Sequence, residues 1–403
     1  MAKTLDFWFD YSCPYAYLGS TQVEALAARM GAKLALQPML LGGVFKANGT
    51  PQNLMGALSP ARARHNLDDM MRWARRFGVP LAIPAAHPMR IVEVLWATLV
   101  ALSHQRVDPK VMQGFYRAYW IEGRPPSDPA TMRDVLTSAG HDPGAVLARI
   151  EEPAVKDDLR TRTDRAIALG IFGAPSYVVD GKDLYWGQDR MHLVEGAPWA
   201  PGQHETGAEQ HDVDLYWDFS SPFAYLASTQ AAALAARTGA QLTWKPMLLG
   251  GLFRLVGQVD VPLDAMSAPK QRMMRLDMER WARYLGVPFD FPTRFPMNTV
   301  KALRCWLALP EARRDAFREA TFRAYWVEDR DISADDTLRA LLGEGADEVL
   351  ARIQTPEIKQ ALIAATQQAA DAGVFGAPTW VVDGEQLYWG QDRMGFVEEA
   401  LLR

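Results

Sequence analysis

Runs of apolar residues at the start of each half of this chain predict the same elements. Residues 4–9 and 213–217 are rich in β-branched, aromatic and other large apolar side chains, which is typical of buried strands. A helical spacing of apolar residues follows in the first half and stops at Gly31, where a left-handed C-terminal residue is expected. Short strands are expected again at residues 34–40 and 242–249. The pattern therefore predicts the order strand, helix, strand.

The rest of each half changes its period. Residues 60–169 and 268–372 alternate charged and apolar positions at helical intervals with almost no strand signal, so each is expected to form a helical insert. Residues 176–186 and 379–389 then show two short apolar runs around Asp-Gly, which is a strong hairpin signal. A closing helix is expected after each hairpin. The sum is an α/β fold in which each half has the order β-α-β, helical insert, β-β-α.

The two halves are copies of one another. The eight residues Leu-Tyr-Trp-Gly-Gln-Asp-Arg-Met occur at 184–191 and again at 387–394. Residues 10–18, Asp-Tyr-Ser-Cys-Pro-Tyr-Ala-Tyr-Leu, are matched 208 positions later by Asp-Phe-Ser-Ser-Pro-Phe-Ala-Tyr-Leu, so that Cys13 aligns with Ser221. A period of about 200 residues is far above that of solenoid repeats, so the repeating unit is a whole domain.

The repeat sets the expected domain organisation. A length of 403 residues allows two or three ordinary domains, and the duplication selects two. The first repeat is placed at 1–197 and the second at 212–403. Between them, residues 198–211 are polar and rich in glycine and proline, which is typical of a linker.

Composition and charge exclude several classes of partner. A net charge of −5 leaves no basic surface for a phosphate backbone, so no nucleic-acid partner is expected. No apolar stretch is long enough for a membrane span, and the first residues lack a secretory signal, so we expect no membrane association and a cytoplasmic location. The two cysteines, Cys13 and Cys305, occupy non-equivalent positions. A structural disulfide is therefore not expected, Cys305 is interpreted as core filling, and no metal site is predicted.

Five motifs recur in the same order in both halves. They are Asp-x-x-[Ser/Cys]-Pro-x-x-Tyr-Leu at Asp10 and Asp218, Pro-Met-Leu-Leu-Gly-Gly at Pro38 and Pro246, Arg-Trp-Ala at Arg72 and Arg280, Phe-Gly-Ala-Pro-[Ser/Thr] at Phe172 and Phe375, and Trp-Gly-x-Asp-Arg at Trp186 and Trp389. In this order they resemble the glutathione-dependent 2-hydroxychromene-2-carboxylate isomerases and the related kappa-class glutathione transferases. The resemblance covers nearly all of both repeats. It implies two thioredoxin-like domains, each with an inserted all-helical subdomain, as in the DsbA-like architecture.

The resemblance also implies an activity. The first hypothesis is an isomerase that uses a glutathione thiolate to act on a small aromatic substrate with a carboxylate, in a pocket that includes Tyr325 and Trp326 unless these belong to the core. A second is a kappa-like glutathione transferase or a monothiol-disulfide oxidoreductase that uses Cys13. A third is a glutathione- or peptide-binding module without turnover. Members of the family are commonly homodimers, so the two repeats are expected to form an intramolecular pseudo-dimer.

Three residues are candidates for catalysis. The residue before the first proline stands at the N-terminus of a helix, where unpaired N–H groups favour negative charge. Ser221 matches the family serine that donates a hydrogen bond to the glutathione sulfur, although a serine at this position also favours an N-cap. Cys13 departs from the pattern and is open to a reactive or an inert interpretation. Asn298 matches an asparagine in the isomerase site, and the first repeat has Arg90 there.

The remaining candidates are implied to bind glutathione. The residues before the hairpin prolines would pair with the cysteinyl backbone of glutathione across a cis peptide bond, and the Gln-Asp pair at the start of the last helix would hold the γ-glutamyl end. The aspartates are also good first-turn charges without any ligand. The expected binding residues are Ala174, Pro175, Gln188 and Asp189 in the first repeat and Ala377, Pro378, Gln391 and Asp392 in the second.

Overall fold

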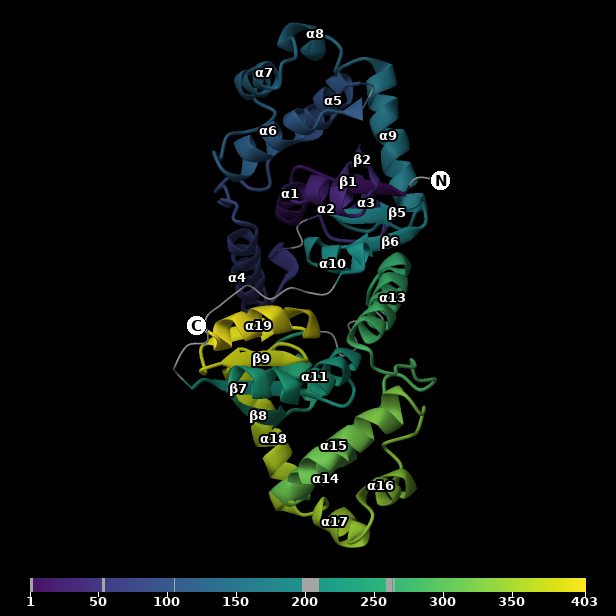
Figure 1. Ribbon diagram of the computed structural model, residues 1–403. Helices are drawn as coiled ribbons and strands as arrows, with labels where there is room; N and C mark the ends of the chain where they lie inside the picture. The colour runs from purple at the N-terminus through teal and green to yellow at the C-terminus, as the bar shows by residue number, and fades with distance from the viewer. Residues whose placement is uncertain (1–2, 53–54, 105, 198–209, 259–262, 264) are drawn as a thin grey trace. The chain divides into compact units, whose positions relative to one another are not determined.

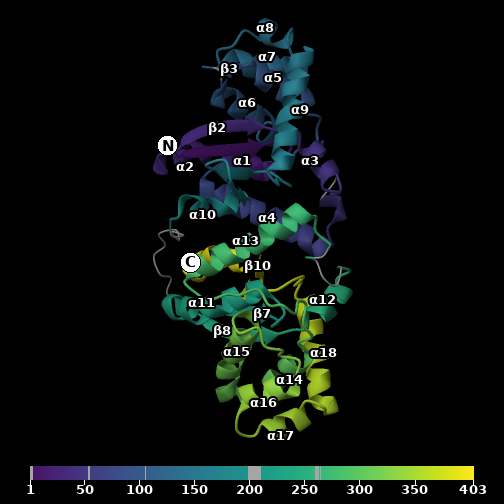
Figure 2. The same ribbon diagram turned by 90° about the vertical axis from the view of Figure 1, so that its right-hand side faces the viewer.

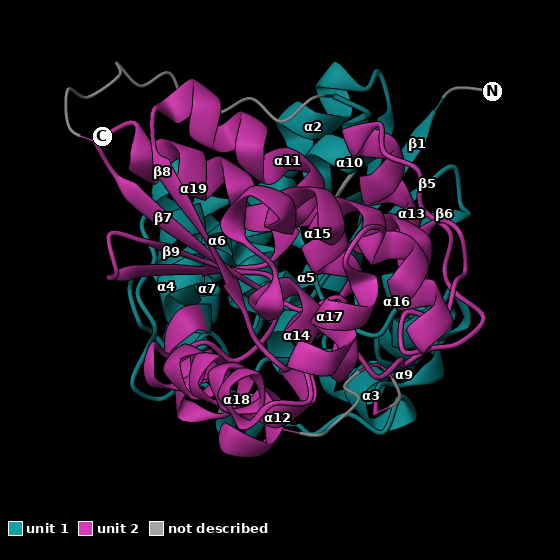
Figure 3. Cartoon of the chain, turned by 90° about the horizontal axis from the view of Figure 1, so that it is seen from below, with its two compact units in different colours: residues 1–57, 66–198, 266–274 teal, residues 58–65, 199–265, 275–403 magenta. Residues whose placement is uncertain are grey.

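The chain forms two compact units (Figure 3). The computed structural model describes residues 3–52, 55–104, 106–197, 210–258, 263 and 265–403. Unit 1 contains residues 1–57, 66–198 and 266–274, and unit 2 contains residues 58–65, 199–265 and 275–403. Each unit therefore combines most of one repeat with a short segment of the other. The expected linker at 198–211 lies outside the described residues except for its last two positions.

Unit 1 is built on a four-stranded mixed sheet. Its strands are β1 (Thr4–Phe9), β2 (Lys33–Pro38), β5 (Ser176–Val179) and β6 (Asp183–Trp186), in the order β2-β1-β5-β6. The strand β1 pairs in parallel with β2 and antiparallel with β5, and β5 pairs antiparallel with β6. The central strands β1 and β5 are almost entirely buried, which explains their run of large apolar residues.

Helices surround this sheet and form the insert. They are α1 (Pro14–Ser20), α2 (Val23–Arg29), α3 (Leu41–Ala47), α4 (Pro60–Phe77), α5 (Val92–Val100), α6 (Pro109–Trp120), α7 (Pro129–Ser138), α8 (Pro143–Leu147), α9 (Pro153–Ala168) and α10 (Met191–Glu195), with a short hairpin, β3 (Leu102–Ser103) and β4 (Arg106–Val107), after α5. Helices α5 to α8 gather at one end of the unit, and α9 runs from them back to the sheet (Figures 1 and 2).

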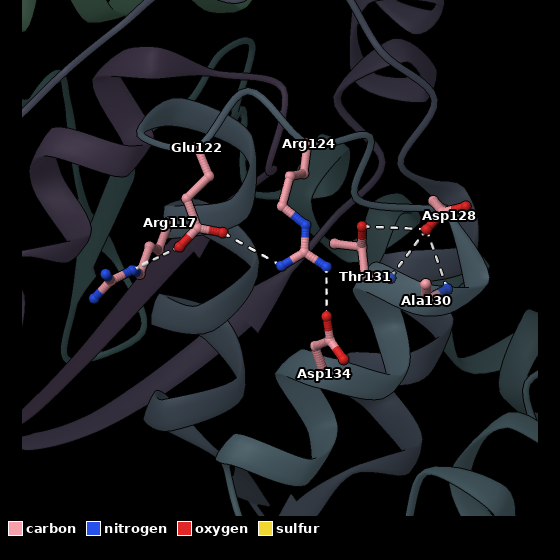
Figure 4. A network of polar contacts seen from close by, with 7 residues as sticks. All are labelled: Arg117, Glu122, Arg124, Asp128, Ala130, Thr131 and Asp134. Carbon is pink, nitrogen blue, oxygen red and sulfur yellow. Dashed lines mark hydrogen bonds and ion pairs between the residues drawn. The ribbon is translucent and has the colours of Figure 1, made fainter.

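Local capping and ion pairs define the turns of the insert. Asp128 accepts hydrogen bonds from two backbone N–H groups at the start of α7, which begins at a proline. Arg124 joins Glu122, just beyond α6, to Asp134 on α7 (Figure 4). Glu122 also pairs with Arg117 on α6. The cap and the ion-pair chain together fix the corner between α6 and α7.

Unit 2 repeats the same architecture. Its strands are β7 (Asp212–Trp217), β8 (Gln241–Pro246), β9 (Thr379–Val382) and β10 (Gln386–Trp389), in the order β8-β7-β9-β10. Its helices are α11 (Pro222–Thr238), α12 (Leu249–Leu255), α13 (Ala268–Leu285), α14 (Val300–Ala308), α15 (Glu311–Trp326), α16 (Asp335–Leu342), α17 (Ala346–Arg352), α18 (Pro356–Asp371) and α19 (Met394–Leu401). Two helices are divided between the units, because residues 60–65 of α4 belong to unit 2 and residues 268–274 of α13 belong to unit 1. The expected α/β element order is confirmed in both repeats.

Large aromatic side chains fill the space between each sheet and its insert. Trp120 and Trp326 end the helices α6 and α15 and are fully buried. The indole N–H of Trp326 donates to Phe219 O at 2.9 Å, and that of Trp120 donates to Tyr11 O at the same distance. Tyr325 is also fully buried. Tyr325 and Trp326 therefore belong to the core, which is one of the two interpretations that the sequence left open, and Trp326 supports the loop before α11.

The first helical segment differs between the repeats. The apolar pattern predicts one continuous helix, and in unit 2 this is α11, which ends at Gly239 with φ of 71°. In unit 1 the helix is broken after Ser20, where α1 ends and α2 begins at Val23. Cys305 is buried on α14, as expected for core filling. Among the described residues, no helix is long and apolar enough to cross a membrane.

Candidate functional site

Ser221 makes two hydrogen bonds at the start of α11. Its backbone is extended (φ −99°, ψ 116°), and its Oγ accepts from Ala224 N at 3.1 Å, which makes it the N-cap. The hydroxyl also donates to Ala377 O at 2.9 Å. Ser221 is buried, and Pro222 occupies the first helical position at no cost in hydrogen bonding. The capping role and a hydroxyl directed at the loop before Pro378 therefore occur together.

Cys13 occupies the equivalent place in unit 1 but carries different chemistry. Its Sγ donates to Ala174 O at 3.1 Å, and its side chain makes no capping hydrogen bond. Burial raises the pKa of the Cys13 thiol to about 12, and the nearby charge of Asp10 adds to the rise. The desolvation outweighs the favourable field of the helix N-terminus, so the thiol stays protonated at neutral pH. Of the two interpretations that the sequence left open for Cys13, the raised pKa favours the inert one.

Each predicted proline loop is joined to the predicted γ-glutamyl loop. The peptide bonds Ala174-Pro175 and Ala377-Pro378 are cis, as expected. Gly187 N donates to Pro175 O at 3.0 Å in unit 1, and Gly390 N donates to Pro378 O at 2.9 Å in unit 2. The two loops that carry the expected binding residues are therefore held side by side in each unit.

Two glycines in each unit allow this close approach. A Cβ on Gly376 would lie 2.6 Å from the indole nitrogen of Trp389, and the same holds for Gly173 in unit 1. Gly390 has φ of 114°, and a Cβ there would lie 2.3 Å from the Asp392 carboxylate. Any larger residue at these positions would displace the tryptophan or the aspartate, which explains the Phe-Gly-Ala-Pro and Trp-Gly-x-Asp-Arg motifs.

The Gln-Asp pairs lie in a short turn before the last helix. The sequence places them at the helix start, whereas the structure has 3₁₀ turns, η2 (Gln188–Arg190) and η3 (Gln391–Arg393), and only then α10 and α19. Asp392 pairs with Arg393 at 3.0 Å, and the first repeat has the same pair at 2.9 Å. About a tenth of each of these side chains is exposed, and Gln188 and Gln391 are buried.

A buried carboxylate organises the loop before Ser221. Asp218 is fully buried at the end of β7. It accepts hydrogen bonds from Ser220 N at 3.0 Å, from Leu249 N at 2.7 Å and from Thr299 Oγ1 at 2.7 Å. Burial raises the pKa of Asp218, and these donors oppose the rise. Asp218 thus joins the Ser221 loop to the start of α12 and to the helical insert.

The equivalent carboxylate in unit 1 lacks the hydrogen bond from the insert. Asp10 accepts from Ser12 N at 2.8 Å, from Ser12 Oγ at 2.6 Å and from Leu41 N at 2.8 Å. The position aligned with Thr299 is Ile91, which has no hydroxyl. Burial raises the pKa of Asp10 as well. The bond from this carboxylate to the insert is therefore specific to unit 2.

Asn298 lies next to this bond. Its side chain is exposed, and its Oδ1 accepts a hydrogen bond from Val300 N, at the first residue of α14, at 3.0 Å. Its neighbour Thr299 is bonded to Asp218, which brings this segment to the loop of Ser221. In unit 1 the aligned Arg90 forms an ion pair with Glu93 at 2.6 Å.

The structure therefore assembles the predicted residues separately in each unit. In unit 2, Ser221 touches the Ala377 carbonyl directly, and Asn298 is connected through Asp218. Sequence reasoning quoted both aspartates within motifs but gave them no role, and it did not consider Thr299. The signal for the aspartates was present, because an aspartate at a strand end with serine two residues later favours a side-chain hydrogen bond to the backbone.

Comparisons with known proteins agree with the duplication. A family profile described as a DSBA-like thioredoxin domain matches residues 4–197 and again 212–402. A 2-hydroxychromene-2-carboxylate isomerase of Sphingobium xenophagum is 33% identical over 193 residues, which cover 47% of this chain and 97% of the relative. Glutathione S-transferase kappa 1 of Rattus norvegicus is 27% identical and matches 48% of this chain and 90% of its own length.

One solved structure is similar to this chain over about the length of one repeat. It is a 2-hydroxychromene-2-carboxylate isomerase with 24% sequence identity and a TM-score of 0.44, covering 48% of this chain and 93% of its own. Each of these relatives thus has the length of a single repeat of this chain.

Proposed function

We propose that this chain is a glutathione-dependent isomerase. The chain belongs to the DsbA-like thioredoxin family, as a tandem duplication of a domain of the isomerase and kappa transferase type. Its substrate would be an aromatic carboxylate of the 2-hydroxychromene-2-carboxylate class. The single observation that carries the proposal is the Ser221 hydroxyl, fixed at the N-terminus of α11 and directed at the carbonyl before a cis proline.

The residues of unit 2 fit glutathione in three ways. The hydroxyl of Ser221 is a donor that can turn from the Ala377 carbonyl to a ligand sulfur. The carboxylate of Asp392 suits the ammonium of the γ-glutamyl end, and the backbone N–H groups of the turn that contains Asp392 suit the carboxylate of that end. The Ala377 backbone would pair with the cysteinyl backbone once Ser221 has turned away.

Glutathione would supply a thiolate that adds reversibly to the substrate and leaves after isomerisation. Ser221 and the helix N-terminus would hold the negative charge on this sulfur. Asn298, at the exposed start of α14, would contact the substrate. Asp218 would keep Ser221 and Asn298 in register, because its carboxylate is bonded to the segments that carry both.

Two differences favour unit 2 as the isomerase site. Cys13 presents a protonated thiol where Ser221 presents a hydroxyl. Arg90, paired with Glu93, stands in place of Asn298. The raised pKa of Cys13 also argues against a thiol oxidoreductase, since the thiolate is the reactive form. We therefore assign turnover to unit 2 and glutathione binding to both units.

The proposal is tested by the rate of 2-hydroxychromene-2-carboxylate isomerisation with and without reduced glutathione. Wild type should require glutathione, and Ser221→Ala should lower kcat/KM by about tenfold to a hundredfold, the value of a hydrogen bond to a charged group. Cys13→Ala is the matched control at the aligned position and should keep most of the activity. Equal loss in both variants, or turnover without glutathione, would contradict the assignment.

A further inference from the structure

We propose that His65 is a positioning residue for the Ser221 site. By sequence, His65 belongs to the first repeat, on the first turns of α4. By its contacts it belongs to unit 2, which includes residues 58–65. The site of the second repeat would then depend on a side chain that the second repeat does not encode.

The imidazole of His65 holds a backbone amide of the predicted binding region. Its Nε2 accepts a hydrogen bond from Trp389 N at 3.1 Å, and the side chain is buried. Accepting this bond requires an unprotonated Nε2, so the ring is neutral and its proton is on Nδ1. Trp389 ends β10 and directly precedes Gly390, Gln391 and Asp392, which form the predicted γ-glutamyl loop.

The same ring packs against the proline loop. The centroid of His65 lies 5.4 Å from that of Phe375 and 6.3 Å from that of Trp389, with the ring edge-on in both cases. Phe375 directly precedes Gly376, Ala377 and Pro378. One side chain therefore supports both loops on which the Ser221 site is built, at their shared base rather than at the ligand.

The aligned segment in unit 1 also places a cation over the tryptophan that ends the hairpin, but it has no imidazole. Arg62 lies over the Trp389 ring at 5.3 Å, and its aligned residue Lys270 lies over Trp186 at 5.4 Å. The residue aligned with His65 is Met273, which is buried on α13. A thioether is a weak acceptor, so Met273 can fill space but cannot hold an amide as imidazole does.

This difference joins the two already described. Serine replaces cysteine, asparagine replaces arginine, and histidine replaces methionine, all in favour of unit 2. The inference takes the identity of the ligand, glutathione, from the proposed function, whereas the contact of His65 with the Trp389 amide is independent of it. Two measurements on the full chain therefore test the contact and the ligand separately.

The first measurement is hydrogen exchange of the Trp389 amide in wild type, His65→Met and His65→Gln. The Met variant carries the residue of the aligned position and should exchange at least about tenfold faster, because the amide loses its acceptor. The Gln variant keeps an acceptor oxygen where Nε2 lies and should restore protection. Unchanged exchange in His65→Met would overturn the positioning role whatever the ligand.

The second measurement is calorimetric titration with reduced glutathione in single-site backgrounds. Asp189→Ala should silence unit 1, and in that background His65→Met should weaken binding about tenfold, while His65→Gln should recover most of it. Asp392→Ala should silence unit 2, and there His65→Met should have no effect.

The outcomes are distinct. Absence of glutathione binding by wild type would overturn the proposed function, and the amide exchange would still decide the role of His65 as support for the Trp389 loop. Normal glutathione binding that is unaffected by His65→Met in the Asp189→Ala background would overturn the inference alone. Equal weakening in both backgrounds would also overturn it, because it would indicate a general loss of stability.

Discussion

At the scale of single residues, the two sites use one geometry with two chemistries. Ser221 Oγ donates to Ala377 O at 2.9 Å and Cys13 Sγ donates to Ala174 O at 3.1 Å. Only Ser221 also accepts a hydrogen bond from the helix and so is fixed as its cap. A neutral hydroxyl can donate to an anionic ligand sulfur at any physiological pH, and the buried thiol of Cys13 is a weaker donor in the same place.

The raised pKa of Cys13 predicts slow alkylation. With a pKa near 12 in place of 9.0, the thiolate fraction at pH 8 falls roughly a thousandfold, and burial slows access further. In native protein, iodoacetamide should leave Cys13 unmodified at pH 8 and should react faster as the pH rises, without levelling off near pH 9. Mass spectrometry of the Cys13 peptide measures this, with unfolded protein as the control. Rapid modification of native Cys13 at pH 7 would instead support a reactive thiol.

At the scale of elements, each unit joins its first loop to the insert by a shared tryptophan bond and by a second bond that differs between the units. In unit 2, Asp218 accepts from Thr299 at the N-terminus of α14. In unit 1, Tyr11 and Thr98 share a hydrogen bond of 2.7 Å between the loop and α5. The loop and the insert are therefore joined in both units, but only in unit 2 does the bond run through the buried carboxylate beside the predicted catalytic serine.

Loss of the hydrogen bond from Thr299 to Asp218 should lower the stability of the protein more than a substitution that keeps this bond. Thr299→Ile introduces the residue of the first repeat and leaves the buried carboxylate without one donor, so we expect a loss of about 1 to 3 kcal/mol in the free energy of unfolding. Thr299→Ser keeps the hydroxyl and should lose less. Denaturant unfolding gives both values, and the isomerase rate should fall with the Ile variant. Equal stability of the two variants would show that the bond contributes nothing.

The elements were largely predictable from periodicity, and the exceptions have physical causes. The hairpin at Asp-Gly and the strand runs followed the rules of turn chemistry and burial. The break after Ser20 was not predicted, because the apolar spacing continues across it. The sequence left Trp326 open between a pocket and the core, because an aromatic residue looks alike in both until its neighbours are known.

At the scale of the whole molecule, the two repeats keep one architecture while their candidate site residues differ. The candidate residues could be transferred from the family motifs, including both cis prolines. The contact of His65 with Trp389 could not, because it joins residues 324 positions apart in different repeats. Motif spacing reports the repeat boundaries, whereas membership of a compact unit depends on tertiary contacts.

The central claim is that unit 2 keeps the sulfur of bound glutathione ionised. It is tested most directly by titrating the ultraviolet absorbance of the bound thiolate against pH, in the Asp189→Ala background that leaves one site, with S-methylglutathione as the blank. We predict that the pKa of bound glutathione lies well below that of the free thiol and returns towards the free value in Ser221→Ala. An unchanged pKa on binding, or the same lowered pKa without the serine hydroxyl, would contradict the account.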